Sequence, residues 1–266
     1  MKRWVRLTPF APDQALPSPW NSFVKGSGVL EAAGSTLRLL NGPTATKQYT
    51  NAQIDDYQRL SRGDFLWRPP LWMTVRARFS HPAGTLRGTA GFGFWNDPFL
   101  MTGLRRPALP RVVWFFYSSP PSWLKLDLTT PGCGWKAATL DAIRWPFFAL
   151  LPTAPVAVPL MNIGWLYRTF WPVGQRAIHV SERLVPVNMT HWHTYQIDWQ
   201  ERRVRFTVDN YPVLDCDTSP RGPLGFVLWL DNQYMVVTPW GKLGYGLVAG
   251  DSQQWLEISQ LEIESE

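Results

Sequence analysis

Cysteine and histidine are scarce in this chain of 266 residues, which contains two cysteines and four histidines. Cys133 and Cys216 match no metal-binding or redox spacing, and so few histidines do not readily form a zinc site. The glycines of residues 91–93 lack the third glycine and the following helix of a nucleotide-binding motif. We therefore expect no metal, no cofactor and two plain thiols, with a disulfide between them as the alternative.

Charged residues are also few, at 17% of the chain against 45% hydrophobic residues, a composition that supports a folded core and excludes disorder. The net charge of +6 brings nucleic acid or an anionic membrane into consideration as a partner. The basic residues are scattered, however, and Arg203 and Arg205 alternate with apolar residues as on the solvent side of a strand. We therefore expect no nucleic-acid partner.

The N-terminal region shows no secretory signal, because its basic residues are not followed by an apolar run of about 7–15 residues. This predicts a cytoplasmic location, with association to a membrane as an alternative. Aromatic residues, in contrast, are abundant, with 16 Trp, 14 Phe and 8 Tyr. Their number exceeds what a core of this size usually needs, which predicts a ligand surface lined by rings.

Short apolar stretches separated by turn residues predict an all-β fold. Residues 71–79 alternate between apolar and polar positions, as in a half-buried strand. Residues 91–95 and 112–117 are apolar on both sides, which is typical of central strands. Further strands are expected at 29–30, 36–40, 49–57, 193–199, 203–209, 211–214, 224–230 and 255–263. The pattern predicts a single antiparallel β-sandwich domain over residues 1–266.

The segment 136–178 differs from the rest in being rich in Trp, Phe, Leu and Pro. From Trp145 to Tyr167 there are 23 residues without a charge, which is long enough to cross a bilayer. Four prolines within this run argue against a membrane-spanning helix. We interpret the segment as an apolar insertion or lid over the site, with peripheral membrane contact through 145–172 as the alternative.

Motifs in both halves of the chain follow the order of one known family. Residues 74–79 (TVRARF) and 91–95 (GFGFW) come first, followed by 192–199 (WHTYQIDW), 204–209 (VRFTVD) and 255–263. They resemble the concanavalin A-like lectin/glucanase superfamily, and in particular family-16 glycoside hydrolases of the laminarinase and lichenase type. The resemblance implies a concanavalin A-like jelly roll and a carbohydrate ligand.

The catalytic strand of that family has no counterpart in this chain. In the family, an E-x-D-x-E or E-x-D-x-x-E strand follows the F-W strand and supplies the nucleophile and the acid/base. The corresponding residues 110–117 (PRVVWFFY) contain no carboxylate. Because retaining hydrolysis requires two carboxyl groups about 5–5.5 Å apart, we expect no standard hydrolase acid pair.

Two Trp-x-Asp motifs, residues 95–97 and 229–231, provide the remaining candidate site. Alternate residues of a strand share a face, so each motif sets an indole beside a carboxylate, and the glycines upstream are expected to leave space above the sheet. A carboxyl group buried against indoles has a raised pKa and can act as a general acid. We expect Asp97 to take this role with Asp231 as its partner; the alternative is that both aspartates only organise turns.

The candidate residues therefore fall into two groups. The expected catalytic residues are Asp56, Asp97 and Asp231. The expected ligand-binding residues are Gln53, Asp55, Tyr57, Trp95, Asn96, Trp114, Phe116, Trp229, Asn232 and Gln233. Two functions are compatible with them. The first is a carbohydrate-binding or carbohydrate-active protein; the second is an isomerase or cyclase that protonates an apolar, isoprenoid-like ligand.

Overall fold

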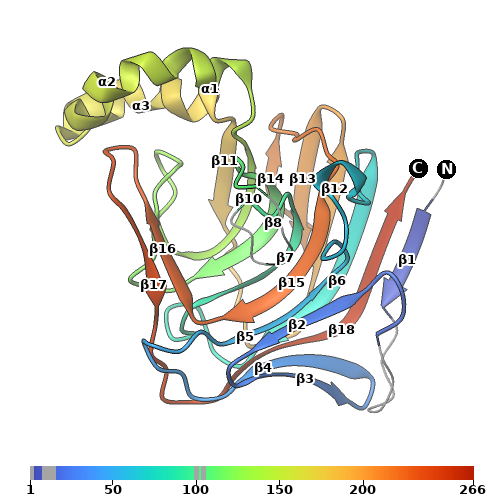
Figure 1. The fold of residues 1–266 in the computed structure, drawn as a ribbon. Coiled ribbons are helices and arrows are strands. Elements are labelled where there is room, and N and C mark those ends of the chain that lie inside the picture. The colour runs from blue at the N-terminus through green and yellow to red at the C-terminus, as the bar shows by residue number, and fades with distance from the viewer. Residues whose placement is uncertain (1–2, 8–15, 99–101, 103–105) are drawn as a thin grey trace.

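The computed structural model describes residues 3–7, 16–98, 102 and 106–266. Two curved antiparallel sheets are stacked, helices lie together at one end, and the start of β1 lies beside the C-terminal end of β18 (Figure 1). The eight-stranded sheet has the order β14 (Tyr211–Cys216), β13 (Arg203–Val208), β12 (His193–Gln200), β6 (Leu71–Phe79), β18 (Gln254–Ser265), β4 (Thr36–Asn41) and β3 (Gly28–Ala33), and β1 (Arg3–Leu7) pairs with β18.

The seven-stranded sheet has the order β11 (Val180–Leu184), β10 (Gly134–Asp141), β8 (Arg111–Ser118), β7 (Thr89–Trp95), β15 (Gly225–Asp231), β5 (Asn51–Asp55) and β2 (Asn21–Lys25). A smaller sheet contains β17 (Leu243–Leu247), β16 (Gln233–Val237) and β9 (Trp123–Leu124). The helices are α1 (Trp145–Leu150), α2 (Ala154–Leu160) and α3 (Gly164–Ala177), with short 3₁₀ turns at Arg62–Asp64 and Leu151–Thr153.

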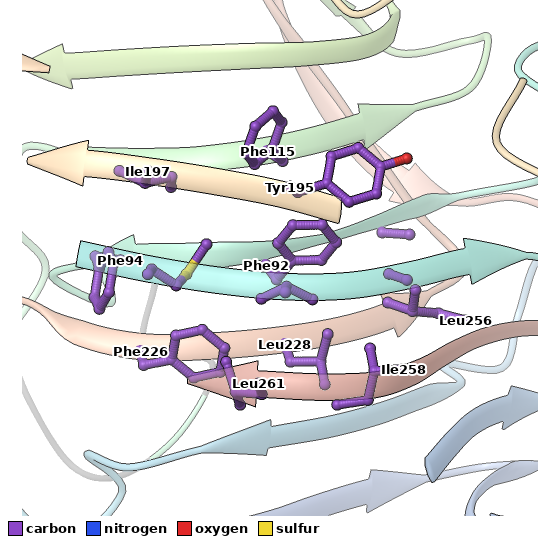
Figure 2. Close-up of a cluster of buried hydrophobic side chains, with 14 of the residues drawn as sticks. Phe92, Phe94, Phe115, Tyr195, Ile197, Phe226, Leu228, Leu256, Ile258 and Leu261 are labelled. Carbon is purple, nitrogen blue, oxygen red and sulfur yellow. The ribbon is translucent and has the colours of Figure 1, made fainter. Parts of the chain in front are cut away.

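A hydrophobic core fills the space between the two large sheets. The alternation of β6 buries every second residue, from Leu71 to Phe79, as its pattern predicts. From the seven-stranded sheet, Phe92, Phe94 and Phe115 point toward side chains of the opposite sheet (Figure 2). The antiparallel β-sandwich predicted from the sequence is thus confirmed.

The apolar segment after β10 is helical. Residues 136–141, expected to open the insertion, belong to β10, and the helices occupy residues 145–177, which we call the helix layer. Its α3 is anchored to the body, since Trp171 Nε1 donates to the Leu126 carbonyl at 2.7 Å and Gln175 donates to Asp127 at 2.6 Å. Among the helices of the described residues, none is long and apolar enough to cross a membrane.

Candidate functional site

Four aromatic rings lie together on the face of the seven-stranded sheet that points away from the sandwich core. They come from adjacent strands, and we call them the ring cluster: Trp95, Trp114, Phe116 and Trp229. Because successive residues of a strand point to opposite faces, the residues between them enter the sandwich core instead. The absence of alternation in these strands therefore reflects two apolar layers, one on each face.

Trp114 is the centre of the ring cluster. Its ring centroid lies 5.0 Å from that of Phe116 in a stacked arrangement, 5.3 Å from Trp229 and 5.9 Å from Trp95. The other three rings are buried, whereas Trp114 is half-buried. Trp114 is therefore the most accessible ring of this cluster.

Two indole N–H groups of the cluster, those of Trp95 and Trp229, donate hydrogen bonds within the protein. Trp95 Nε1 donates to the Tyr57 hydroxyl at 2.6 Å, and Trp229 Nε1 donates to Thr89 Oγ1 at 3.0 Å. A buried indole needs such a partner, and the bond fixes the orientation of the ring. These two rings are consequently held in place before any ligand arrives.

The glycines upstream of the two Trp-x-Asp motifs accommodate the protein's own rings. A Cβ atom on Gly91 would lie 2.9 Å from the ring of Trp229, and one on Gly225 would lie 2.3 Å from the ring of Tyr57. The prediction that these glycines leave space for a ligand above the sheet is therefore wrong. They permit close packing of aromatic side chains against the backbone.

Asp231 lies at the end of β15, beside Trp229. Its Oδ1 accepts hydrogen bonds from Thr89 Oγ1 at 2.7 Å and from the backbone N–H of Gln233 at 3.0 Å. Burial raises the pKa of the Asp231 carboxyl to about 6, against the opposing effect of these donors. The group can therefore exchange a proton near neutral pH.

Asp97 follows β7 in a left-handed backbone conformation with φ of 44°, so the strand geometry that predicts its direction ends before it. It is fully buried. The Arg62 guanidinium braces this turn by donating to the carbonyls of Asn96 and Asp97, each at 2.6 Å. Burial first, and then the negative charges of Asp55 and Asp97, raise the pKa of the Tyr57 hydroxyl well above its ordinary range.

Asp97 and Asp231 lie at opposite ends of the sheet face. The register pairs Asp231 with Thr89, the first residue of β7, whereas Asp97 lies beyond the last residue of that strand. The six residue steps from Thr89 to Trp95 correspond to roughly 20 Å. Glycosidase carboxyl pairs lie about 5–10 Å apart. The structure does not bring these two candidates together, so each can act only alone.

Asp55, the last residue of β5, and Asp56, which follows it, point to opposite sides of the sheet. Asp55 accepts hydrogen bonds from Gln53 and Gln58, each at 2.8 Å, and burial raises its pKa. Asp56 accepts hydrogen bonds from Trp67, a ring of the sandwich core, and from the backbone of Phe226. Burial raises the pKa of Asp56 to about 7. The structure thus places Asp56 on the core side, away from the ring cluster.

The two candidate asparagines hold neighbouring loops. Asn96 donates to the Leu109 carbonyl and accepts from the Arg111 N–H, both at 2.9 Å. Asn232 accepts from the Thr50 N–H and donates to the Gln48 carbonyl, again at 2.9 Å in each case. Their polar atoms are therefore engaged in shaping the edges of the site. The backbone of Gln233, the neighbouring candidate, binds Asp231 as described above.

A buried ion pair that sequence reasoning missed lies next to the cluster. Lys136 on β10 is in register with Phe116, and its Nζ lies 3.1 Å from Glu182 Oε2 on β11. Burial raises the pKa of Glu182, while Lys136 opposes the shift. Lys136, the only basic residue of the largely apolar strand β10, was the available signal. Among the described residues, no group of three or more His, Cys, Asp or Glu side chains is placed to bind a metal.

Comparison with known proteins identifies the fold. The family model described as "Glycosyl hydrolases family 16" matches residues 163–225. A search of the curated proteins found no match. A GlcNAcα1-4Gal-releasing endo-β-galactosidase from Clostridium perfringens is 14% identical with a TM-score of 0.52, and the alignment covers 98% of this chain but 62% of that one.

Two further solved structures cover 98% of both chains at 10% identity. One is a β-glucanase of Bacillus licheniformis, with a TM-score of 0.51, and the other is described under endo-acting O-glycanases of the human gut microbiota that initiate mucin breakdown, with a TM-score of 0.54. The resemblance to the concanavalin A-like, family-16 architecture expected from the sequence is confirmed for the fold.

Proposed function

We propose that this protein binds a carbohydrate at the ring cluster, with Trp114 as the ring on which a sugar stacks. The observation that supports this proposal is one half-buried indole among three buried aromatic rings, two of them held by hydrogen bonds. An aromatic platform with a few fixed polar groups is the usual composition of a small-molecule site. The similar structures include an endo-β-galactosidase, a β-glucanase and a protein described under O-glycanases, which agrees with a glycan ligand.

In this proposal the protein binds the carbohydrate but does not cleave it with a pair of carboxylates. The strand β8 (Arg111–Ser118) contains no acidic residue, and its outward positions are occupied by Val112, Trp114 and Phe116. The aspartates Asp97 and Asp231 are too far apart along β7 to act on one glycosidic bond. In this proposal Asp231 contributes to the polar edge of the site as an isolated group.

Polar pairs flank the rings along one row of the sheet. The register places Lys136 beside Phe116 on one side and Gln53 beside Trp229 on the other. Lys136 is paired with Glu182, and Gln53 with Asp55. A sugar lying across the strands would therefore have hydrogen-bonding groups at both ends of an apolar floor, which suits the hydroxyl groups and C–H faces of a pyranose.

A second candidate function is supported by the apolar surroundings of the rings. Four leucines and Ile178, the residue after α3, pack against the larger buried hydrophobic cluster that contains Trp95, Phe116 and Trp229; the leucines are Leu60, Leu109, Leu124 and Leu126. Such walls suit an isoprenoid-like ligand, with the helix layer as its lid. Asp231, with a pKa of about 6, would then act as a single general acid.

A ligand panel distinguishes these two functions. The panel contains β-1,3-1,4-glucan oligosaccharides, mucin O-glycans, a GlcNAcα1-4Gal glycan and the prenyl alcohol farnesol. Thermal shift is measured for the wild type, for Trp114→Ala and for Trp72→Ala, a control that removes an exposed indole from the eight-stranded sheet. We expect a glycan to stabilise the wild type and Trp72→Ala but not Trp114→Ala, with no release of reducing ends.

Three results would contradict the carbohydrate proposal. Stabilisation by farnesol alone would favour the apolar ligand, and an effect of Asp231→Asn on its conversion would support acid catalysis. Glycan binding that is unchanged in Trp114→Ala would place the site elsewhere. Release of reducing ends from a glycan at the same rate by the wild type and by Trp114→Ala would indicate hydrolysis by an acid pair outside β8.

A further inference from the structure

The helix layer presents an apolar surface to the outside of the molecule. Of the eighteen large hydrophobic side chains exposed among the described residues, nine lie between residues 145 and 173. Trp145 is 78% exposed, Val156 67% and Trp165 66%. The nine side chains are Trp145, Phe148, Leu151, Val156, Leu160, Ile163, Trp165, Phe170 and Val173. Such a concentration marks an interaction surface rather than ordinary scattered exposure.

The charge of this surface has one sign. No acidic residue occurs between Asp141 and Glu182, whereas Arg144, Arg168 and Arg176 are exposed in that interval. The first stands immediately before α1, and the other two lie on α3 beside exposed apolar residues. An apolar face edged by arginines, with tryptophans among the exposed rings, matches the interfacial zone of a phospholipid bilayer, where aromatic rings and basic side chains are favoured.

We propose that the helix layer is a membrane-docking element that inserts its outer face into the headgroup region of a bilayer containing anionic phospholipid. The segment is too broken to cross a bilayer, because Pro159 and Pro172 lie inside helices α2 and α3. Short helices lying in the plane of the interface require no such length. The positive edge complements anionic headgroups, and the net charge of the chain, +6, has the same sign.

The interior of the helix layer is also suited to apolar contact. A cavity of about 290 Å³ lies between α1, α2 and α3 and is lined almost entirely by apolar side chains. Three of the nine exposed side chains, Leu151, Phe170 and Val173, also line this cavity, so it is continuous with the apolar surface. The β16–β17 hairpin supports one side of the layer, where the ring centroid of Trp240 lies 5.4 Å from that of Tyr167. The exposed Lys242 follows in that hairpin and adds a further positive charge near the layer.

Vesicle flotation tests this proposal. The full chain is mixed with vesicles of phosphatidylcholine alone or with 30 mol% phosphatidylglycerol. We expect the wild type to float with the anionic vesicles and Val156→Asp to reduce the bound fraction by about tenfold or more, because a carboxylate is costly at this depth. The matched control is Val29→Asp, which places the same charge at an exposed valine of β3, and it should bind like the wild type.

Melting temperatures show whether both variants remain folded, and a more conservative variant, Val156→Ser, should give an intermediate loss of binding. The proposal is overturned if the wild type ignores both kinds of vesicle, or if Val156→Asp binds as well as the wild type. A concentration-dependent dimer that Val156→Asp dissociates, without vesicle binding, would assign the surface to a second copy of the chain. Glycan binding by the ring cluster is measured separately, so the failure of one proposal leaves the other standing.

Discussion

The two faces of the seven-stranded sheet use the same strands to build two different aromatic layers. On the inner face, Phe92 and Phe115 are fully buried and pack against rings such as Tyr195 from the opposite sheet (Figure 2). On the outer face, Trp95 and Trp229 have hydrogen-bonded indoles, and buried carboxylates lie nearby. The inner layer resembles an ordinary core, whereas the outer layer combines hydrogen-bonded indoles with the half-buried ring of Trp114, which is why we propose it as the binding face.

The inner and outer aromatic layers should differ most in how much they contribute to the free energy of unfolding. Phe92→Ala removes a ring whose centroid lies 5.2 to 5.8 Å from those of Tyr195, Phe115 and Trp135. We expect the free energy of unfolding in urea to fall by about 3–5 kcal/mol, as for other buried phenylalanines. Trp114→Ala should cost less than about 2 kcal/mol, since that ring is half-buried. Equal losses would show that the outer layer is simply a second core.

The next prediction concerns the pH dependence contributed by Asp231. Burial raises its pKa to about 6 in the folded protein, so the folded state binds more protons than the unfolded state between pH 4 and 6. Stability from this group is therefore present at low pH and is lost as pH rises through 6, by roughly 3 kcal/mol in total. Asp231→Asn keeps the Oδ1 acceptor and should lack this loss.

Unfolding measured from pH 4 to 8 in the wild type and in Asp231→Asn isolates the effect of this group. Asp56, with a pKa of about 7, adds a similar fall in both proteins and cancels in their difference. The difference should grow in favour of the asparagine variant up to about pH 6 and then stay constant. A difference independent of pH would mean that Asp231 titrates normally and lacks the environment described above.

The fold was largely predictable where one face of a strand meets solvent. The alternation of residues 71–79 gave the limits of β6, and the turn at Asp209 and Asn210 joins β13 to β14 with φ values of 50° and 68°. Residues 136–141 of β10 fall within the insertion that composition predicts at 136–178; both faces of this strand are buried, so no alternation marks it as a strand. The helices were missed because proline usually ends a helix. Here Pro146 and Pro155 occupy first turns, where proline is tolerated, while Pro159 and Pro172 lie inside α2 and α3.

The site was predictable only as far as the strands are regular. Parity along β7 and β15 places Trp95 and Trp229 on one face, as the structure has them. Alternation along β5 likewise assigns Asp56 to the core side, together with Ile54. The choice of Asp56 as a catalytic residue overlooked this. Asp97 departs from its strand through a positive φ, which no alternating pattern reveals. Which glycines pack against aromatic rings depends on tertiary contacts, and the spacing of residues along the sequence does not reveal it.

A smaller loss of stability is expected when an indole hydrogen bond of the ring cluster is removed. Trp95→Phe keeps an aromatic side chain but removes the N–H that donates to the Tyr57 hydroxyl. We expect a loss of about 1–2 kcal/mol in the free energy of unfolding, the usual cost of removing one partner of a buried hydrogen bond. Trp229→Phe, which removes the bond to Thr89, should behave alike. A neutral outcome for both would mean that these bonds do not hold the ring cluster.

The most direct test of the binding face is a calorimetric titration of the glycan that most stabilises the protein. The titration is carried out with the wild type, Trp114→Ala and the control Trp72→Ala. The account predicts that Trp114→Ala weakens binding at least about tenfold, by analogy with the stacking of a nucleic-acid base on an aromatic ring, which is worth roughly 1–3 kcal/mol, whereas Trp72→Ala leaves the Kd unchanged. An unchanged Kd in Trp114→Ala, or no glycan binding by the wild type, would contradict it.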